Sequence, residues 1–241
     1  MNFTPFLSTS DAERAHGTLS RLRGHRIDRL ALTGGMAIEL HRIRLGLLPQ
    51  SRTFNDIDFL VESFDDIPQT LSADLLLRHV HPHDSPAKTL LQCVDPRTAV
   101  RVDFFRAYGS TMGRTMDVEL YGAPMRIISV EDLTARAGRL CMDLATEVPT
   151  PAKHTRDFLR LLPLVDFQSM EPVWAEHRKA NHPESFPAAA NLLHSLIASR
   201  RDLQIVPAYS QDVGAFCSRC ETTESFPLAD AGRILSLLGY C

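Results

Sequence analysis

An acidic pair at the start of an apolar run is the feature that most restricts how this chain can fold. Asp56 and Asp58 flank Ile57 in the run 56–61 (DIDFLV), whose length and composition predict a strand. Side chains alternate across a strand, so both carboxylates share one face while Ile57 points to the core. Carboxylates about 6–7 Å apart along a strand repel each other unless a cation lies between them. Taken alone, such a pair is more often a set of solvated residues at a strand end.

Two further features favour a functional site. The apolar run 99–105 carries a single acidic residue, Asp103, and if its strand neighbours the first, three carboxylates converge. Oxygen ligands of this kind suit Mg²⁺, which completes its shell with waters and substrate phosphates. Gly34 and Gly35 stand between a short apolar run and a helical pattern, where backbone N–H groups favour phosphate. The alternative reading of the glycine pair is a tight strand-to-helix turn.

Hydrophobic spacing predicts the remaining elements. Apolar runs predict a strand over 29–33 and two hairpins, 89–94 with 99–105 and 116–120 with 124–128. Helical patterns are expected over 10–23, 36–47, 71–79, 171–179, 187–200 and 228–238, with further helices opening at Ser129 and at Thr150-Pro151. Ser10 is the expected N-cap of the first helix. The prediction is an α/β (α+β) fold: a small mixed sheet flanked by helices over 1–128, and a helical region over 129–241 packed on it.

Charge and composition exclude several classes of protein. The 241 residues are 44% hydrophobic, and 26 basic residues against 29 acidic ones give a net charge of −3. A chain so balanced does not coat nucleic acid by bulk charge, so any RNA contact would be a local patch. No basic segment followed by a long apolar stretch opens the chain, and no stretch approaches the roughly 20 apolar residues of a membrane span. Five scattered cysteines suit a reducing compartment, so we expect a cytoplasmic protein without a membrane partner.

The segments 32–37 (LTGGMA) and 52–61 (RTFNDIDFLV) resemble the polymerase-β-like nucleotidyltransferase superfamily. Within it, the chain is most similar to AbiEii-type toxins and to uncharacterised bacterial minimal nucleotidyltransferases. The likeness extends to 128–133 (ISVEDL) and to 153–159 (KHTRDFL), which resembles the family's Lys-x-x-x-Asp helix. It covers about residues 29–162. AbiEii-type chains often carry a lysine after the Glu-Asp-Leu segment, where Arg136 and Arg139 are the nearest cations here.

The resemblance implies a fold, a reaction and a set of residue roles. It implies an Mg²⁺-dependent transfer of NMP from an NTP to an acceptor such as a tRNA end, a protein or a small molecule. For the AbiEii-type likeness it also implies a role as the toxin of a toxin–antitoxin pair, with an antitoxin protein as partner. The catalytic metal ligands would be Asp56, Asp58 and Asp103. The nucleotide-binding residues would be Gly34, Gly35, Arg52, Thr53, Lys153 and Asp157.

Four alternatives stay open from the sequence. An antibiotic-modifying adenylyltransferase of the same fold would need an acidic pocket, for which Glu119, Glu131 and Asp132 are candidates. A catalytically silent nucleotide- or partner-binding module is disfavoured because three clustered carboxylates are destabilising without a metal. Lys153 and Asp157 are alternatively an exposed i,i+4 pair worth only tenths of a kcal/mol. The Cys217, Cys220 and Cys241 group is a weak zinc pattern, because it lacks a second close pair.

Overall fold

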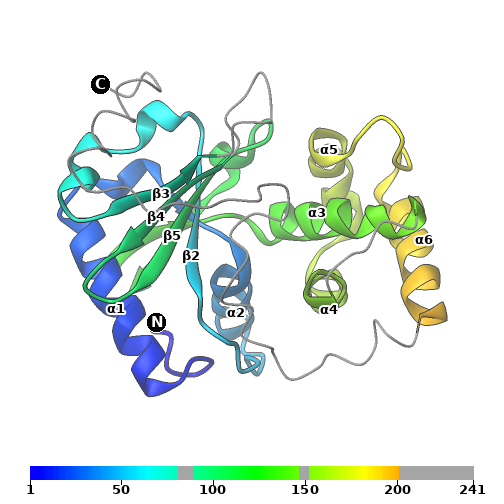
Figure 1. The fold of residues 1–241 in the computed structure, drawn as a ribbon. Coiled ribbons are helices and arrows are strands. Elements are labelled where there is room, and N and C mark those ends of the chain that lie inside the picture. The colour runs from blue at the N-terminus through cyan, green and yellow to red at the C-terminus, as the bar shows by residue number, and fades with distance from the viewer. Residues whose placement is uncertain (81–89, 147–151, 201–241) are drawn as a thin grey trace. The chain divides into compact units, whose positions relative to one another are not determined.

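The computed structural model describes residues 1–80, 90–146 and 152–200, and Figure 1 shows its ribbon. The helices are α1 (Thr9–Arg23), α2 (Gly34–Arg44), α3 (Val130–Cys141), α4 (Ala152–Leu161), α5 (Phe167–His177) and α6 (Phe186–Ser199). The strands are β1 (Ala31–Leu32), β2 (Asp56–Val61), β3 (Leu76–Val80), β4 (Leu90–Asp95), β5 (Val100–Arg106), β6 (Met116–Leu120) and β7 (Ala123–Ile127). Among the described residues no helix is both long and apolar enough to cross a membrane.

The seven strands form one mixed sheet in the order β3-β4-β5-β2-β1-β7-β6. Strand β2 runs parallel to β5 and antiparallel to β1, which in turn runs parallel to β7. Both predicted hairpins, β4–β5 and β6–β7, are confirmed as antiparallel pairs. Strands β2 and β5 therefore lie inside the sheet rather than at its edge, and this brings two acidic segments into adjacent positions.

The alternation predicted for β2 is observed. Ile57 and Phe59 are fully buried, whereas Asp56 and Asp58 are partly exposed on the opposite face. The rings of Phe59 and Phe104 stack with centroids 5.9 Å apart, so the core face of β2 is tied to that of β5. The buried face thereby fixes the register that carries the carboxylates, because a slip of one residue would bury both of them.

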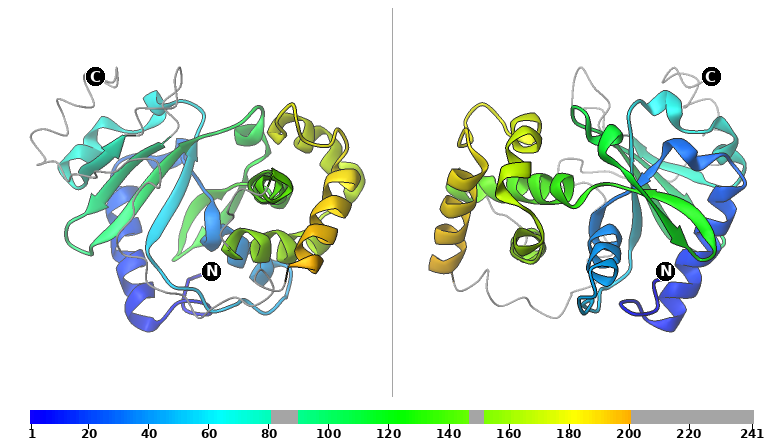
Figure 2. Two further views of the ribbon diagram at one scale, coloured as in Figure 1. Left: turned by 45° about the vertical axis from the view of Figure 1, so that its right-hand side comes forward. Right: turned by 180° about the vertical axis from the view of Figure 1, so that it is seen from behind.

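The described residues divide into two compact units. A sheet unit holds residues 1–107 and 115–127, and a helical unit holds residues 108–114 and 128–200. Helices α3, α4, α5 and α6 pack with one another in the helical unit, as Figure 2 shows from two sides. The only tryptophan of the sequence, Trp174, is fully buried there, and its ring lies edge-on to that of Phe186 with centroids 6.0 Å apart. The division of the chain at residue 128 stays a prediction.

Two predictions of local structure need correction. The helix predicted over 71–79 is wrong: a short 3₁₀ turn (Gln69–Ala73) leads into strand β3, which pairs with β4. The first helix begins earlier than predicted, because Ser8 rather than Ser10 accepts the hydrogen bond from the backbone N–H of Asp11. The helix predicted at Ser129 is confirmed, with Ser129 as its N-cap. The predictions for Thr150-Pro151, for 228–238 and for the three C-terminal cysteines fall outside the described residues.

Candidate metal and nucleotide site

The three aspartates of the sequence pattern meet on one face of the sheet. In the parallel register of β2 and β5, Asp58 lies directly opposite Asp103. One carboxylate oxygen each from Asp56, Asp58 and Asp103 lies within 4.8 Å of the other two. The predicted convergence is thus confirmed. Three anionic oxygen donors at such short separations are the donor set that a hard divalent cation prefers, so these residues fit Mg²⁺.

Arg101 is a cation within this cluster that the sequence analysis missed. It lies opposite Asp56 in the register and forms an ion pair with that carboxylate. Its Nε also lies 3.1 Å from Oδ1 of Asp103. The strand alternation that places Asp103 on the acidic face places Arg101 there too, two residues earlier, so the signal for it was present in the sequence.

Asp103 is the buried member of the cluster. Burial and the neighbouring charge of Asp56, opposed by the positive charge of Arg101, together raise the pKa of Asp103 to about 7. Nε2 of Gln92, which lies opposite on β4, donates a hydrogen bond to Oδ2 of Asp103 at 3.2 Å. Burial and the charge of Asp103 raise the pKa of the Cys93 thiol as well. Of these two residues of β4, Gln92 contacts the buried carboxylate directly, whereas Cys93 lies in the hydrophobic core.

The glycine pair lies against the same cluster. The backbone N–H of Thr33 donates to the carbonyl oxygen of Asp58 at 2.8 Å, which places the start of α2 beside β2. Gly34 has φ +68°, in the left-handed region, and a Cβ at this position would overlap the carboxylate of Asp58. Only glycine meets both conditions without strain. The turn therefore does more than connect β1 to α2, since it lets the backbone approach a metal-ligand candidate.

Arg52 is held at the first turn of α2 by a buried carboxylate. Nε of Arg52 lies 2.6 Å from Oε1 of Glu39, whose side chain is fully buried. The backbone N–H of Gln50 donates to the other oxygen of Glu39 at 2.9 Å. A Cβ on Gly35 would lie 2.6 Å from Nη1 of Arg52, so the guanidinium lies directly against this glycine. Glu39 was missed, because a glutamate within a helical pattern gives no sign of its distant partner.

The other nucleotide-binding candidates are placed as follows. Thr53 lies half-buried in the loop beside Arg52. Lys153 is exposed near the start of α4, and Asp157 follows one turn later in the same helix, with Nε of Arg156 3.9 Å from its carboxylate. Both belong to the helical unit, and their contact with the nucleotide stays a prediction.

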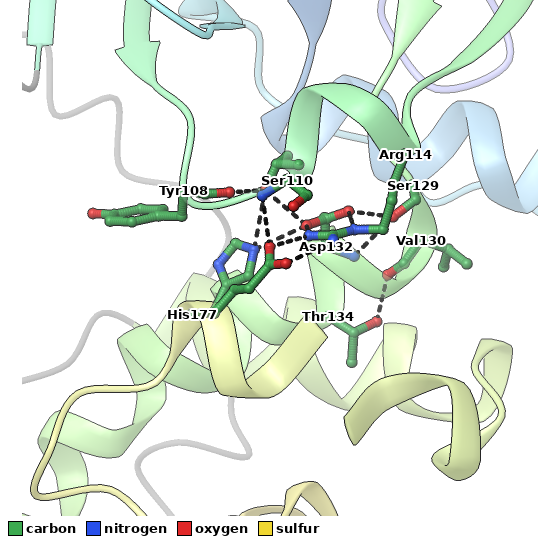
Figure 3. Close-up of polar contacts among 10 residues, drawn as sticks. Tyr108, Ser110, Arg114, Ser129, Val130, Asp132, Thr134 and His177 are labelled. Atoms are coloured by element: carbon green, nitrogen blue, oxygen red, sulfur yellow. Dashed lines mark hydrogen bonds and ion pairs between the residues drawn. The ribbon is translucent and has the colours of Figure 1, made fainter. Parts of the chain in front are cut away.

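A second polar cluster lies inside the helical unit (Figure 3). Nε and Nη2 of Arg114 donate to the two oxygens of Asp132 at 2.9 and 2.8 Å. Thr111, Ser129 and His177 also donate to this carboxylate, at 2.6–2.9 Å. Arg114 is further paired with Glu176 at 2.7 Å. Because Asp132 is fully buried and its oxygens are occupied, it offers no acidic pocket to a cationic antibiotic.

Comparisons with known proteins give only loose likenesses. No protein-family model matches the chain, and no curated protein matches it. Among solved structures it is similar to the polyadenylate synthase of Megavirus, with TM-score 0.44, 12% identity and 65% of this chain covered, but it spans only 32% of that protein.

It is also similar to ANT(2″)-Ia in complex with adenylyl-2″-tobramycin, with TM-score 0.43 and 17% identity over 67% of this chain and 95% of that one. A third likeness is to an antigenic nucleotidyltransferase-like protein from Paracoccidioides brasiliensis, with TM-score 0.42 and 15% identity over 82% and 92% of the two chains. With TM-scores below 0.5, these likenesses do not establish a function for this chain. The proposed function therefore rests on the geometry of the site.

Proposed function

We propose that the chain is an Mg²⁺-dependent nucleotidyltransferase that moves an NMP from an NTP to an acceptor hydroxyl or phosphate. The observation that carries this proposal is the placement of Gly34 against Asp58, with Asp58 directly opposite Asp103. The start of a helix, where backbone N–H groups have no intrahelical acceptor, thus adjoins a cluster of three carboxylates. A triphosphate chelated to a divalent cation needs this pair of features, one for the phosphate oxygens and one for the metal.

The residues of the sheet unit have distinct roles in this proposal. Asp56, Asp58 and Asp103 would hold Mg²⁺, whose chemistry in such sites is to stabilise the attacking and leaving oxygens of an in-line displacement. Asp103 would also accept the proton of the attacking hydroxyl. Gly34 and Gly35 would present backbone N–H groups to the phosphates.

Two cations and their neighbours would complete the nucleotide site. Arg52, which Glu39 holds in place, would donate to a phosphate oxygen as pyrophosphate leaves. Lys153 would add a second positive charge from α4, with Thr53 and Asp157 beside the two cations as further nucleotide contacts. The acceptor classes proposed are a tRNA end, a protein or a small molecule, and a toxin role with an antitoxin partner belongs to the same proposal.

Transfer of label from NTP tests this function directly. The protein is incubated with Mg²⁺ and each of the four labelled NTPs, with and without total tRNA, and products are separated by size. We expect incorporation from at least one NTP, and its loss in Asp58→Asn. Asp65→Asn is the matched control, because Asp65 is an exposed carboxylate of the same unit outside the cluster. Nucleotide binding without transfer in the wild-type protein, unchanged in Asp58→Asn, would identify a silent binding module instead.

A further inference from the structure

A pocket of about 420 Å³ lies in the sheet unit, outside the carboxylate cluster, and three arginines line it: Arg23, Arg26 and Arg126. Its apolar wall is formed by Ile27 and by strand β7 residues that include Pro124 and Met125. The carboxylates of Asp28 and Asp117 complete the polar part of the lining. The volume is within the range of pockets that enclose small organic ligands, about 300–1,000 Å³.

Strand β1 separates this pocket from the candidate active site. Asp28, at the pocket, precedes β1, and Arg126 lies opposite Ala31, the first residue of that strand. After the strand, the backbone of Thr33 contacts Asp58. The pocket and the carboxylates therefore lie towards opposite ends of β1, and their two sets of lining residues have no member in common.

Two of the three arginines of the pocket have no acidic partner among the described residues. Nη2 of Arg23 donates only to the backbone oxygen of Leu120, and its Nε is buried without an acceptor in the described part of the chain. Burial lowers the pKa of Arg23. Arg26 is exposed, with φ 59° and ψ 60° in the left-handed region. Within the described residues neither Arg23 nor Arg26 has an acidic partner, so an anion would supply the missing counter-charge.

We propose that this pocket binds the phosphate and the adjoining ring of a nucleotide unit, as a site separate from the chemistry. Guanidinium groups match the oxygens of a phosphate in charge and in geometry. The apolar wall gives a base or sugar a surface to pack on, and the two carboxylates can accept hydrogen bonds from hydroxyl or amino groups of the same unit. The same chemistry is offered by a free nucleotide and by one residue of an RNA strand.

Binding without metal separates this site from the proposed active site. In buffer with EDTA, a fluorescent single-stranded RNA oligonucleotide is titrated with protein and followed by polarisation, and AMP and inorganic phosphate are titrated as competitors. The variants are Arg26→Gln, at an exposed position, and Arg23→Gln. Arg29→Gln is the matched control: it loses the same charge from the same loop, its partner is Asp66 at 2.7 Å, and it does not line the pocket.

We expect Arg26→Gln and Arg23→Gln to weaken binding about tenfold each, the usual effect of losing one charge-assisted hydrogen bond, while Arg29→Gln changes it less than twofold. RNA that binds much more tightly than AMP identifies a nucleic-acid strand as the ligand, and equal affinities identify a free nucleotide. Asp58→Asn should leave this binding unchanged, whether or not the chain is a nucleotidyltransferase. An equal loss in Arg29→Gln, or no binding of either probe, would overturn the proposal.

Discussion

Arg101 and Asp56 lie opposite each other in the register of β5 and β2 and form an ion pair inside the carboxylate cluster. The protein thus carries its own counter-charge at the place where a metal would be held. Burial lowers the pKa of Arg101, but the charges of Asp103, Asp56 and Asp58 outweigh burial and raise it overall. The guanidinium stays protonated there, so it offsets part of the repulsion among the aspartates in the absence of Mg²⁺.

Replacing this cation should therefore destabilise the metal-free protein. We expect Arg101→Gln to lower the free energy of unfolding by about 2–3 kcal/mol. This is somewhat less than the loss expected for a fully buried ion-pair partner, because the Arg101 side chain is partly exposed. Urea unfolding in EDTA measures the change. Excess Mg²⁺ should restore more stability to Arg101→Gln than it adds to the wild type. Arg97→Gln, an exposed arginine of the β4–β5 turn, should have no comparable effect, and an equal loss in both variants would contradict the counter-ion role.

The contact between Gly34 and Asp58 gives a second prediction with a built-in control. Gly34→Ala adds a Cβ where φ is +68° and where the carboxylate of Asp58 lies. The substitution should therefore strain the backbone and also displace a candidate metal ligand. Gly46→Ala has the same backbone cost at φ +72° but meets nothing within 4 Å. Each should lower stability by about 1–3 kcal/mol. Calorimetric titration with Mn²⁺ should show weakened binding in Gly34→Ala alone, and equal metal affinities in both variants would count against the site.

The polar cluster of the helical unit predicts a loss of stability in acid. Burial raises the pKa of Asp132, but hydrogen bonds from Arg114, His177, Ser129 and Thr111 outweigh burial and hold it below the ordinary value. Hydrogen bonding to Arg114 likewise lowers the pKa of Glu176 to about 2. Carboxyl groups with depressed folded-state pKa values stabilise the fold above their ordinary pKa near 4, and this contribution is lost as pH falls towards 2.

Fluorescence of the single tryptophan, Trp174, reports on this unit and can follow acid unfolding. Arg114→Gln should move the midpoint to higher pH, because both carboxylates lose the partner that depresses their pKa. Lys153→Gln removes a charge from an exposed position of the same unit and should leave the midpoint in place. A midpoint that does not move in Arg114→Gln would show that the cluster does not determine acid stability.

Lys153 provides the test of whether the helical unit takes part in nucleotide binding. We expect Lys153→Ala to weaken NTP binding by about 1.5–3 kcal/mol, the scale of a charge-assisted hydrogen bond, with thermal stability unchanged. Equilibrium dialysis with labelled NTP and a thermal melt measure the two quantities. Lys179→Ala, a second exposed lysine of this unit, is the control. Lost stability with intact nucleotide affinity would make Lys153 a surface residue without a part in the chemistry.

The sequence was most informative where local periodicity and function coincide. The limits of β2, the two hairpins and the meeting of the three aspartates follow from alternation in short segments. Strand β3 was mistaken for a helix, because Leu75, Leu76 and Leu77 form an uninterrupted apolar run whose period is ambiguous, and only pairing with β4 decides it. The Glu39–Arg52 ion pair was beyond prediction for a related reason, since nothing local indicates which buried acid meets which arginine.

The assignment of residues 108–114 to the helical unit bears on how the chain is made. Arg114 leaves the ribosome 62 residues ahead of Glu176, and Asp132 follows it only after the β6–β7 hairpin has been synthesised. Residues 108–114, the first segment of the helical unit, are therefore made before Asp132 and Glu176 are available to Arg114. In that interval the chain adds strands β6 and β7 of the sheet unit. A gene cut between codons 127 and 128 would separate Arg114 from both of its carboxylate partners. Neither fragment would then carry a complete helical unit.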